Sequence, residues 1–139
     1  MIDLGIKLTS RDAKMPTRAY KGDVGIDCYS CQSATIHPNS VAEIILGISL
    51  DIPEGHWVGI YTRSSYAKRG LLAHHGIIDS GYKGSIVCFL FNPTNKTQHI
   101  KKGDKVCQLI THKIIEDGIK AINTKKRGTN GYGSSDNAK

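Results

Sequence analysis

The stretch Gly76-Ile77-Ile78-Asp79-Ser80-Gly81-Tyr82-Lys83-Gly84 holds one acidic and one aromatic residue in a glycine-rich turn. Apolar residues flank the turn, with Ile77 and Ile78 before it and residues 85–92 after it. Glycine provides the backbone freedom that a tight turn needs, so the stretch predicts a β-hairpin that presents the carboxylate of Asp79. Asp, Ser and Gly are also ordinary turn residues, and a purely structural role stays open from this stretch alone.

Further strands are predicted on both sides of this turn. Ile2, Leu4, Ile6 and Leu8 alternate with polar or small residues, which is the period-two pattern of a half-buried strand. The other predicted strands are Val41 to Leu50, Trp57 to Thr62, Ser85 to Asn92, Lys105 to Thr111 and Gly118 to Asn123. Many short strands separated by turn residues predict an all-β sandwich, jelly roll or barrel.

One short helix is predicted, from Ser64 or Ser65 to Arg69. Serine favours the start of a helix, and Gly70 stands where a left-handed cap ends one. The helix follows the strand predicted at Trp57 to Thr62 directly.

The chain of 139 residues is long enough for one domain with its own core. From residue 125 onward the composition shifts to Lys, Gly, Ser, Thr and Asn, so we expect a β domain at 1–124 and a flexible tail at 125–139. No apolar run approaches the ~20 residues of a membrane span, and the start lacks the pattern of a signal peptide. We therefore expect a soluble, intracellular protein, cytoplasmic or nuclear.

The net charge and the cysteines leave several kinds of partner and site open. A net charge of +7 suits a polyanionic partner, either nucleic acid or a small phosphorylated ligand. Cys28 and Cys31 have the C-x-x-C spacing of redox and zinc sites, but Cys88 and Cys107 have no second ligand nearby in the sequence. We expect unpaired thiols.

Four further segments suit a nucleotide. Arg63, Ser64 and Ser65 place a guanidinium and two hydroxyls where one anion could bind, although Ser64 could simply cap the helix. Asp27 could hold a water molecule on Mg²⁺, or could be an ordinary solvated acid. Gln108 is a lone polar side chain in an apolar run, so its amide must bond to the backbone or to a ligand.

The fourth segment lies in the tail, at Arg127 to Ser135. It holds an aromatic residue, Tyr132, between glycines, with a cation before it and hydroxyls after it. Such a segment can stack on a base and wrap a polyphosphate, although low-complexity tails often have a similar composition.

The five segments occur in one order, and together they resemble the five motifs of the homotrimeric dUTPases. The matching ranges are Ala19 to Ser30, Thr62 to Gly70, Gly76 to Asn92, Gly103 to Ile110 and Arg127 to Ser135. The resemblance implies a jelly-roll fold, a homotrimer with shared active sites, and Mg²⁺-assisted hydrolysis of dUTP to dUMP and pyrophosphate. Such an enzyme limits uracil incorporation into DNA and supplies dUMP for dTMP synthesis.

The resemblance also implies a role for each matching residue. Asp79 would be the general base, Asp27 would contact the water shell of Mg²⁺, and Gly76, Ile77, Tyr82 and Tyr132 would bind the uracil and the deoxyribose. The positions that hold the phosphates are Arg63, Ser64, Ser65, Gln108, Arg127, Gly133, Ser134 and Ser135.

Some residues depart from the family pattern. His75 precedes Gly76 where the family usually has a small residue, so we expect His75 to narrow the uracil pocket. The related dCTP deaminases carry a catalytic Glu where this chain has Phe89, which cannot transfer a proton.

Two functions of a different class stay open, a non-catalytic signalling protein and a basic nucleic-acid-binding module. Intact Asp79 argues against the signalling protein. The lack of interleaved aromatic and basic residues argues against the nucleic-acid-binding module. We expect neither nucleic acid nor membrane as a partner.

Overall fold

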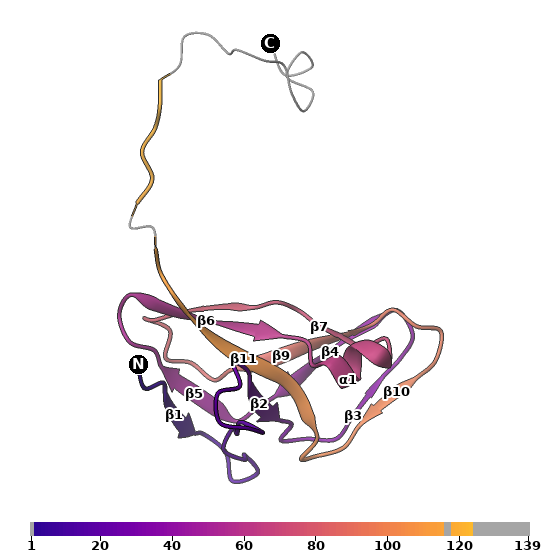
Figure 1. Cartoon of the computed structure of the whole chain (residues 1–139). Helices are drawn as coiled ribbons and strands as arrows, with labels where there is room; N and C mark the ends of the chain where they lie inside the picture. The colour runs from indigo at the N-terminus through magenta and orange to yellow at the C-terminus, as the bar shows by residue number, and fades with distance from the viewer. Residues whose placement is uncertain (1, 116–117, 124–139) are drawn as a thin grey trace.

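A computed structural model describes residues 2–115 and 118–123, which form eleven strands and one short helix (Figure 1). In chain order these are β1 (Gly5–Leu8), β2 (Ile26–Tyr29), β3 (Ala34–Ile36), β4 (Ser40–Ile45), β5 (Ile48–Asp51), β6 (His56–Tyr61), α1 (Ser64–Lys68), β7 (Leu72–Ala73), β8 (Ile77–Asp79), β9 (Val87–Asn92), β10 (Gln98–Ile100) and β11 (Lys105–Lys113). No helix in these residues is long and apolar enough to cross a membrane.

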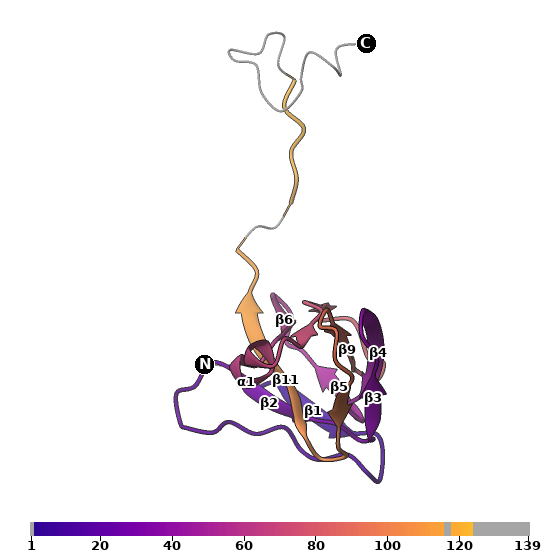
Figure 2. The same cartoon turned by 90° about the vertical axis from the view of Figure 1, so that its right-hand side faces the viewer.

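The strands pair antiparallel in four groups. A four-stranded sheet has the order β2-β11-β6-β8, and a three-stranded sheet has the order β4-β9-β7. Two further pairs, β1-β5 and β10-β3, complete the fold. Figure 2 shows β2 and β11 on one side of the interior and β4 and β9 on the other. The predicted all-β, jelly-roll-like fold is confirmed.

Side chains alternate along the strands between the interior and the surface, and the inward-pointing ones fill the core between the sheets. On β9, Cys88 and Leu90 point inward, while Phe89 and Phe91 point outward and are exposed. The largest fully buried side chains include Ile36, Ile44, Leu46, Ile48, Leu71, Leu90, Ile100 and Leu109. Burial of these aliphatic groups is the main driving force for the fold.

The predicted stretch at Val41 to Leu50 is two strands rather than one. Gly47 lies between β4 and β5 with a φ of +67°, a left-handed conformation that interrupts a strand and favours glycine. The strand predicted at Gly118 to Asn123 is also absent from the described residues. This segment extends away from the body (Figures 1 and 2), and Ile119 is 99% exposed, so it pairs with none of the strands that the structure describes.

The predicted hairpin around Asp79 is a connection between two sheets. β8 pairs with β6, whereas β9 pairs with β4 and β7. The same turn residues serve a hairpin and a sheet-to-sheet connection, which is why local sequence did not separate the two. We call residues 76–86 the Asp79 loop.

Candidate active site

Asp27, Arg63 and Lys105 form a compact charged cluster where three elements meet. Asp27 lies on β2, Arg63 follows β6, and Lys105 begins β11. One carboxylate oxygen of Asp27 accepts a hydrogen bond from Arg63 Nε at 3.1 Å, and the other lies 3.2 Å from Lys105 Nζ. The side chains of Asp27 and Arg63 are only 14% and 24% exposed. The first two motifs are therefore joined by a partly buried ion pair.

Gln108 lies beside this cluster at the centre of the sheet. It pairs in register with Asp27 on β2 and with Tyr61 on β6. Its amide nitrogen donates to the carbonyl of Thr62 at 3.1 Å. Gly25 leaves room for the amide, because a Cβ atom at position 25 would lie 2.0 Å from Gln108 Oε1. The polar side chain is thus satisfied by the backbone of the second motif.

Helix α1 lies where the sequence predicted a helix, but no serine caps its first turn. The N-cap residue is Arg63, which makes no side-chain capping hydrogen bond. Ser64 is therefore not the cap that the simpler interpretation of this motif requires. Ser65 accepts a hydrogen bond from Arg63 Nη1 at 3.0 Å, and both serines are exposed. Gly70 ends the helix with a φ of +82°, as predicted.

The Asp79 loop forms a separate pocket between the diverging strands β8 and β9. Asp79 is exposed, and its carbonyl accepts a hydrogen bond from the backbone N–H of Tyr82 at 3.0 Å. Gly76, Ile77 and Tyr82 line a cavity of about 160 Å³ together with residues of β9. A closed hairpin would leave no such space, because paired strands lie only about 5 Å apart.

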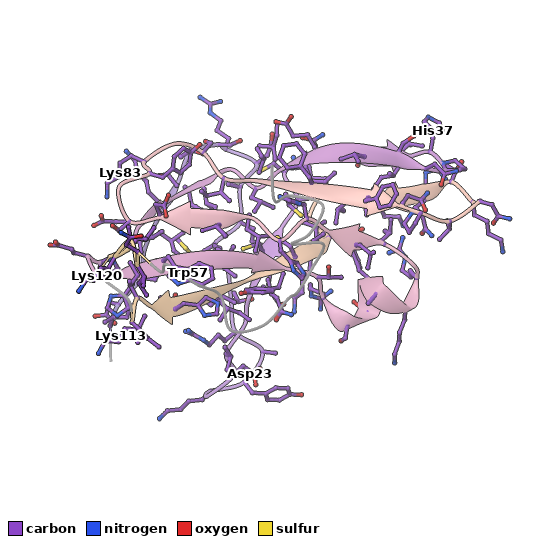
Figure 3. All side chains as sticks on the ribbon, turned by 90° about the horizontal axis from the view of Figure 1, so that it is seen from above. Asp23, His37, Trp57, Lys83, Lys113 and Lys120 are labelled. Atoms are coloured by element: carbon purple, nitrogen blue, oxygen red, sulfur yellow. The ribbon has the colours of Figure 1, made fainter. Side chains whose placement is uncertain are left out.

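The charged cluster and Asp79 lie far apart within one chain. Asp79 pairs in register with Trp57, and Arg63 lies six positions after Trp57 in the chain. At about 3.3 Å per residue, this corresponds to roughly 20 Å along β6. In Figure 3, Lys83 of the Asp79 loop lies toward one end of the molecule and the helix that follows Arg63 lies toward the other. The structure therefore brings Asp27, Arg63, Ser65 and Gln108 together, but not with Asp79 and Tyr82.

Comparison with known proteins identifies the family. The family model described as dUTPase matches residues 11–136. A deoxyuridine 5'-triphosphate nucleotidohydrolase of Clostridium tetani is 36% identical, covering 94% of each chain, and that of Saccharomyces cerevisiae is 34% identical, covering 96% of this chain and 95% of its own. The chain belongs to the dUTPase family.

Solved dUTPases have the same fold. A dUTPase variant of Staphylococcus bacteriophage 80alpha, solved with dUpNHpp, has a TM-score of 0.83 and 26% identity over 97% of this chain and 99% of its own. A variant of the phage phi11 dUTPase, described for its coordination of a structural Mg(II) ion, has a TM-score of 0.82 and 25% identity over 89% of this chain and 99% of its own.

His74 and His75, which precede Gly76 of the third dUTPase motif, lie in different surroundings. The ring of His75 packs against Tyr61, with centroids 5.2 Å apart, and His75 is not among the residues that line the 160 Å³ cavity. His74 lines the cavity instead. His75 therefore does not narrow this cavity, and its effect on the binding of uracil stays a prediction.

The cysteines do not form a reactive site. All four are free, and Cys28, Cys88 and Cys107 are fully buried. A hydrogen bond with Cys107, and then burial, raises the pKa of the Cys88 thiol far above its usual range. Burial, and then the nearby Asp12 carboxylate, also raises the pKa of Cys31. The thiols of Cys31 and Cys88 therefore stay protonated at neutral pH, as expected of unpaired structural cysteines.

The tail residues of the dUTPase pattern lie outside the described residues. These are Arg127, Tyr132, Gly133, Ser134 and Ser135. Their roles remain predictions from the sequence.

Proposed function

We propose that this chain hydrolyses dUTP to dUMP and pyrophosphate by attack of water on the α-phosphorus. The activity class, dUTP diphosphatase, follows from membership of the family. The observation that carries the residue assignments is the clustering of Asp27, Arg63, Ser65 and Gln108, since three separate motifs meet at one polar site.

Asp79 is the general base in this proposal. Its side chain is exposed and lies in the Asp79 loop, which belongs to the segment that matches the third dUTPase motif. The carboxylate accepts a proton from the attacking water as the new P–O bond forms. The bond to the bridging oxygen breaks, and pyrophosphate leaves.

Arg63, Ser64, Ser65 and Gln108 hold the phosphates. Phosphoryl transfer depends mainly on positioning and on neutralising negative charge, for which a guanidinium, two exposed hydroxyls and an amide are suitable donors. From the tail, Arg127, Gly133, Ser134 and Ser135 would add donors. Lys105, for which the sequence predicted no role, adds a cation beside Asp27.

The residues present fit Mg²⁺ bound through the substrate. No group of three acidic, histidine or cysteine side chains among the described residues could cage a metal ion, so a protein-only site is not expected there. Asp27 has two oxygens that each retain lone pairs beyond their ion pairs, and it can accept a hydrogen bond from metal-bound water. When bound to the triphosphate, Mg²⁺ supplies charge neutralisation.

The pocket of the Asp79 loop binds the nucleoside. The backbone around Gly76 and Ile77 contacts the uracil, and the ring of Tyr82 packs under the deoxyribose. Tyr82 is held in place, since its hydroxyl donates to the carbonyl of Ser85 at 3.2 Å. Tyr132 of the tail would stack on the base.

The separation of Asp79 from Arg63 supports a site shared between copies of the chain, in keeping with the proposed homotrimer. A general base must lie within hydrogen-bond reach of the attacking water, yet Asp79 lies roughly 20 Å along β6 from Arg63 of the same chain. Exposed apolar side chains offer surfaces for association: Val41, Leu72, Phe89 and Phe91 line a hollow of about 500 Å³ on the outer face of β4, β9 and β7. Apolar surface of this kind typically marks a protein interface.

Phe89 argues against a dCTP deaminase. It lies on β9 in the wall of the cavity, where the deaminase family carries its catalytic Glu. A phenyl ring cannot transfer the protons that deamination requires.

The decisive test is pyrophosphate release from dUTP, dCTP, dTTP and UTP, each with and without Mg²⁺. We expect release from dUTP alone, dependent on the metal, and no ammonia from dCTP. Release of pyrophosphate from all four nucleotides, or from none, would contradict the proposal. Light scattering should give three times the mass of one chain.

A further inference from the structure

Two consecutive histidines between β7 and β8 have different surroundings. The backbone N–H of His74 donates to the carbonyl of Phe89 at 2.8 Å, which extends the pairing of β7 with β9. The backbone N–H of Gly76 donates to the carbonyl of His74 at 2.9 Å, so the chain turns at His75. The ring of His75 packs on Tyr61 of β6, whereas His74 lines the nucleoside pocket.

The pocket that His74 lines is mostly apolar. Its walls include Ile60, Ile77, Ile86, Val87 and Phe89. Small-molecule pockets usually combine such walls with a few polar groups that fix the orientation of the ligand. The polar side chains of this lining can therefore contribute to recognition of the base beside the loop backbone.

Three polar side chains line the pocket, and two of them already have partners. The Tyr82 hydroxyl donates to the carbonyl of Ser85. The Ser85 hydroxyl lies 3.2 Å from the hydroxyl of Thr9. The imidazole of His74 has no hydrogen-bond partner among residues 2–115 and 118–123, and it is exposed in the single chain.

We propose that the imidazole of His74 is a further specificity-determining group that donates a hydrogen bond to a carbonyl oxygen of the uracil. This inference rests on the proposed function. Uracil presents two carbonyl oxygens at the edge of its ring, and a neutral imidazole carries one N–H donor. The side chain therefore adds to the base recognition that the loop backbone supplies.

The contact is made to the base, away from the reacting phosphorus. It acts equally in the ground state and the transition state, so its loss raises KM and leaves kcat unchanged. Loss of one such hydrogen bond typically weakens binding about 10-fold.

The test measures binding of dUMP by calorimetry and turnover of dUTP by the full-length chain. His74→Ala should weaken dUMP binding and raise KM for dUTP about 10-fold with kcat unchanged. His74→Gln keeps an N–H donor and should recover most of the affinity. His75→Ala is the matched control and should bind dUMP as the unsubstituted protein does, because that ring faces Tyr61.

His74 also borders the apolar hollow at Phe89 and Phe91, so the mass of each variant is measured by light scattering. An unchanged mass with weakened dUMP binding supports base recognition. Unchanged dUMP affinity in His74→Ala, or a loss of affinity explained by loss of oligomer, overturns this inference while the proposed function stands. Failure of the unsubstituted protein to hydrolyse dUTP overturns both.

Discussion

The carboxylate of Asp27 accepts a hydrogen bond from the guanidinium Nε of Arg63 at 3.1 Å, which joins the first and second motifs across 36 residues of sequence. The other carboxylate oxygen pairs with Lys105 of the fourth motif. One acid thus orients two cations in a partly buried position before any nucleotide binds. Groups fixed in advance stabilise developing charge without reorganising.

Replacing Asp27 with Asn should therefore affect both stability and activity. The amide keeps the shape of the side chain but loses the charge that faces Arg63 and Lys105. We expect the free energy of unfolding in urea to fall by about 1–2 kcal/mol, and turnover to need more Mg²⁺. Asp51→Asn is the control, since its pair with Lys83 is largely exposed and should contribute almost nothing. Equal effects of the two substitutions would contradict this role of Asp27.

Gly25 should be intolerant of a side chain because of Gln108. A Cβ at position 25 would lie 2.0 Å from Gln108 Oε1, so Gly25→Ala must displace the amide. We expect kcat/KM for dUTP to fall about 10-fold or more, the scale of one lost hydrogen bond. The double variant Gly25→Ala, Gln108→Ala should match Gln108→Ala alone in a double-mutant cycle. Additive losses would mean that Gly25 acts in another way.

The sequence predicted the longest strands and named Asp27, Arg63 and Gln108 as site residues, but it predicted neither the ion pairs of Asp27 nor how the strands share the sheets. Period-two alternation located β1, and segments bounded by turn residues located β6, β9 and β11, because both signals are local properties of the sequence. The pairing of β8 with β6 instead of β9 depends on long-range packing, and no turn residue encodes it. The same limit explains why His74 was missed: its side chain faces the pocket only because β7 continues along β9.

Asp79→Asn should separate chemistry from binding. The amide retains the size of the side chain but cannot accept the proton of the attacking water. We expect turnover of dUTP to fall about 100-fold or more, while dUMP binding measured by calorimetry stays near normal. Near-normal turnover would remove Asp79 from the role of general base.

Tyr82 should set the preference for deoxyribose. If its ring crowds the 2′ position, Tyr82→Ala should raise activity toward UTP relative to dUTP, measured as the ratio of kcat/KM values. Tyr82→Phe keeps the ring and loses only the hydrogen bond to the Ser85 carbonyl, so it should keep the preference. An unchanged ratio in Tyr82→Ala would mean that another group excludes the 2′-hydroxyl.

Removal of the tail before Lys125 should affect catalysis far more than stability. Residues 125–139 contain little apolar surface besides Tyr132, so they add little to a folded core. We expect an unchanged thermal denaturation midpoint and an unchanged number of chains in the oligomer. The same residues hold Arg127 and an aromatic ring suited to stack on the uracil, and a segment that closes over the phosphates excludes water. Turnover of dUTP should therefore fall about 100-fold or more, the size expected for the loss of preorganised phosphate contacts.

A Tyr132→Ala variant of the full-length chain should lose part of this activity. If the shortened chain no longer forms oligomers, the tail is structural, and if it hydrolyses dUTP at the full rate, the tail has no role in the site.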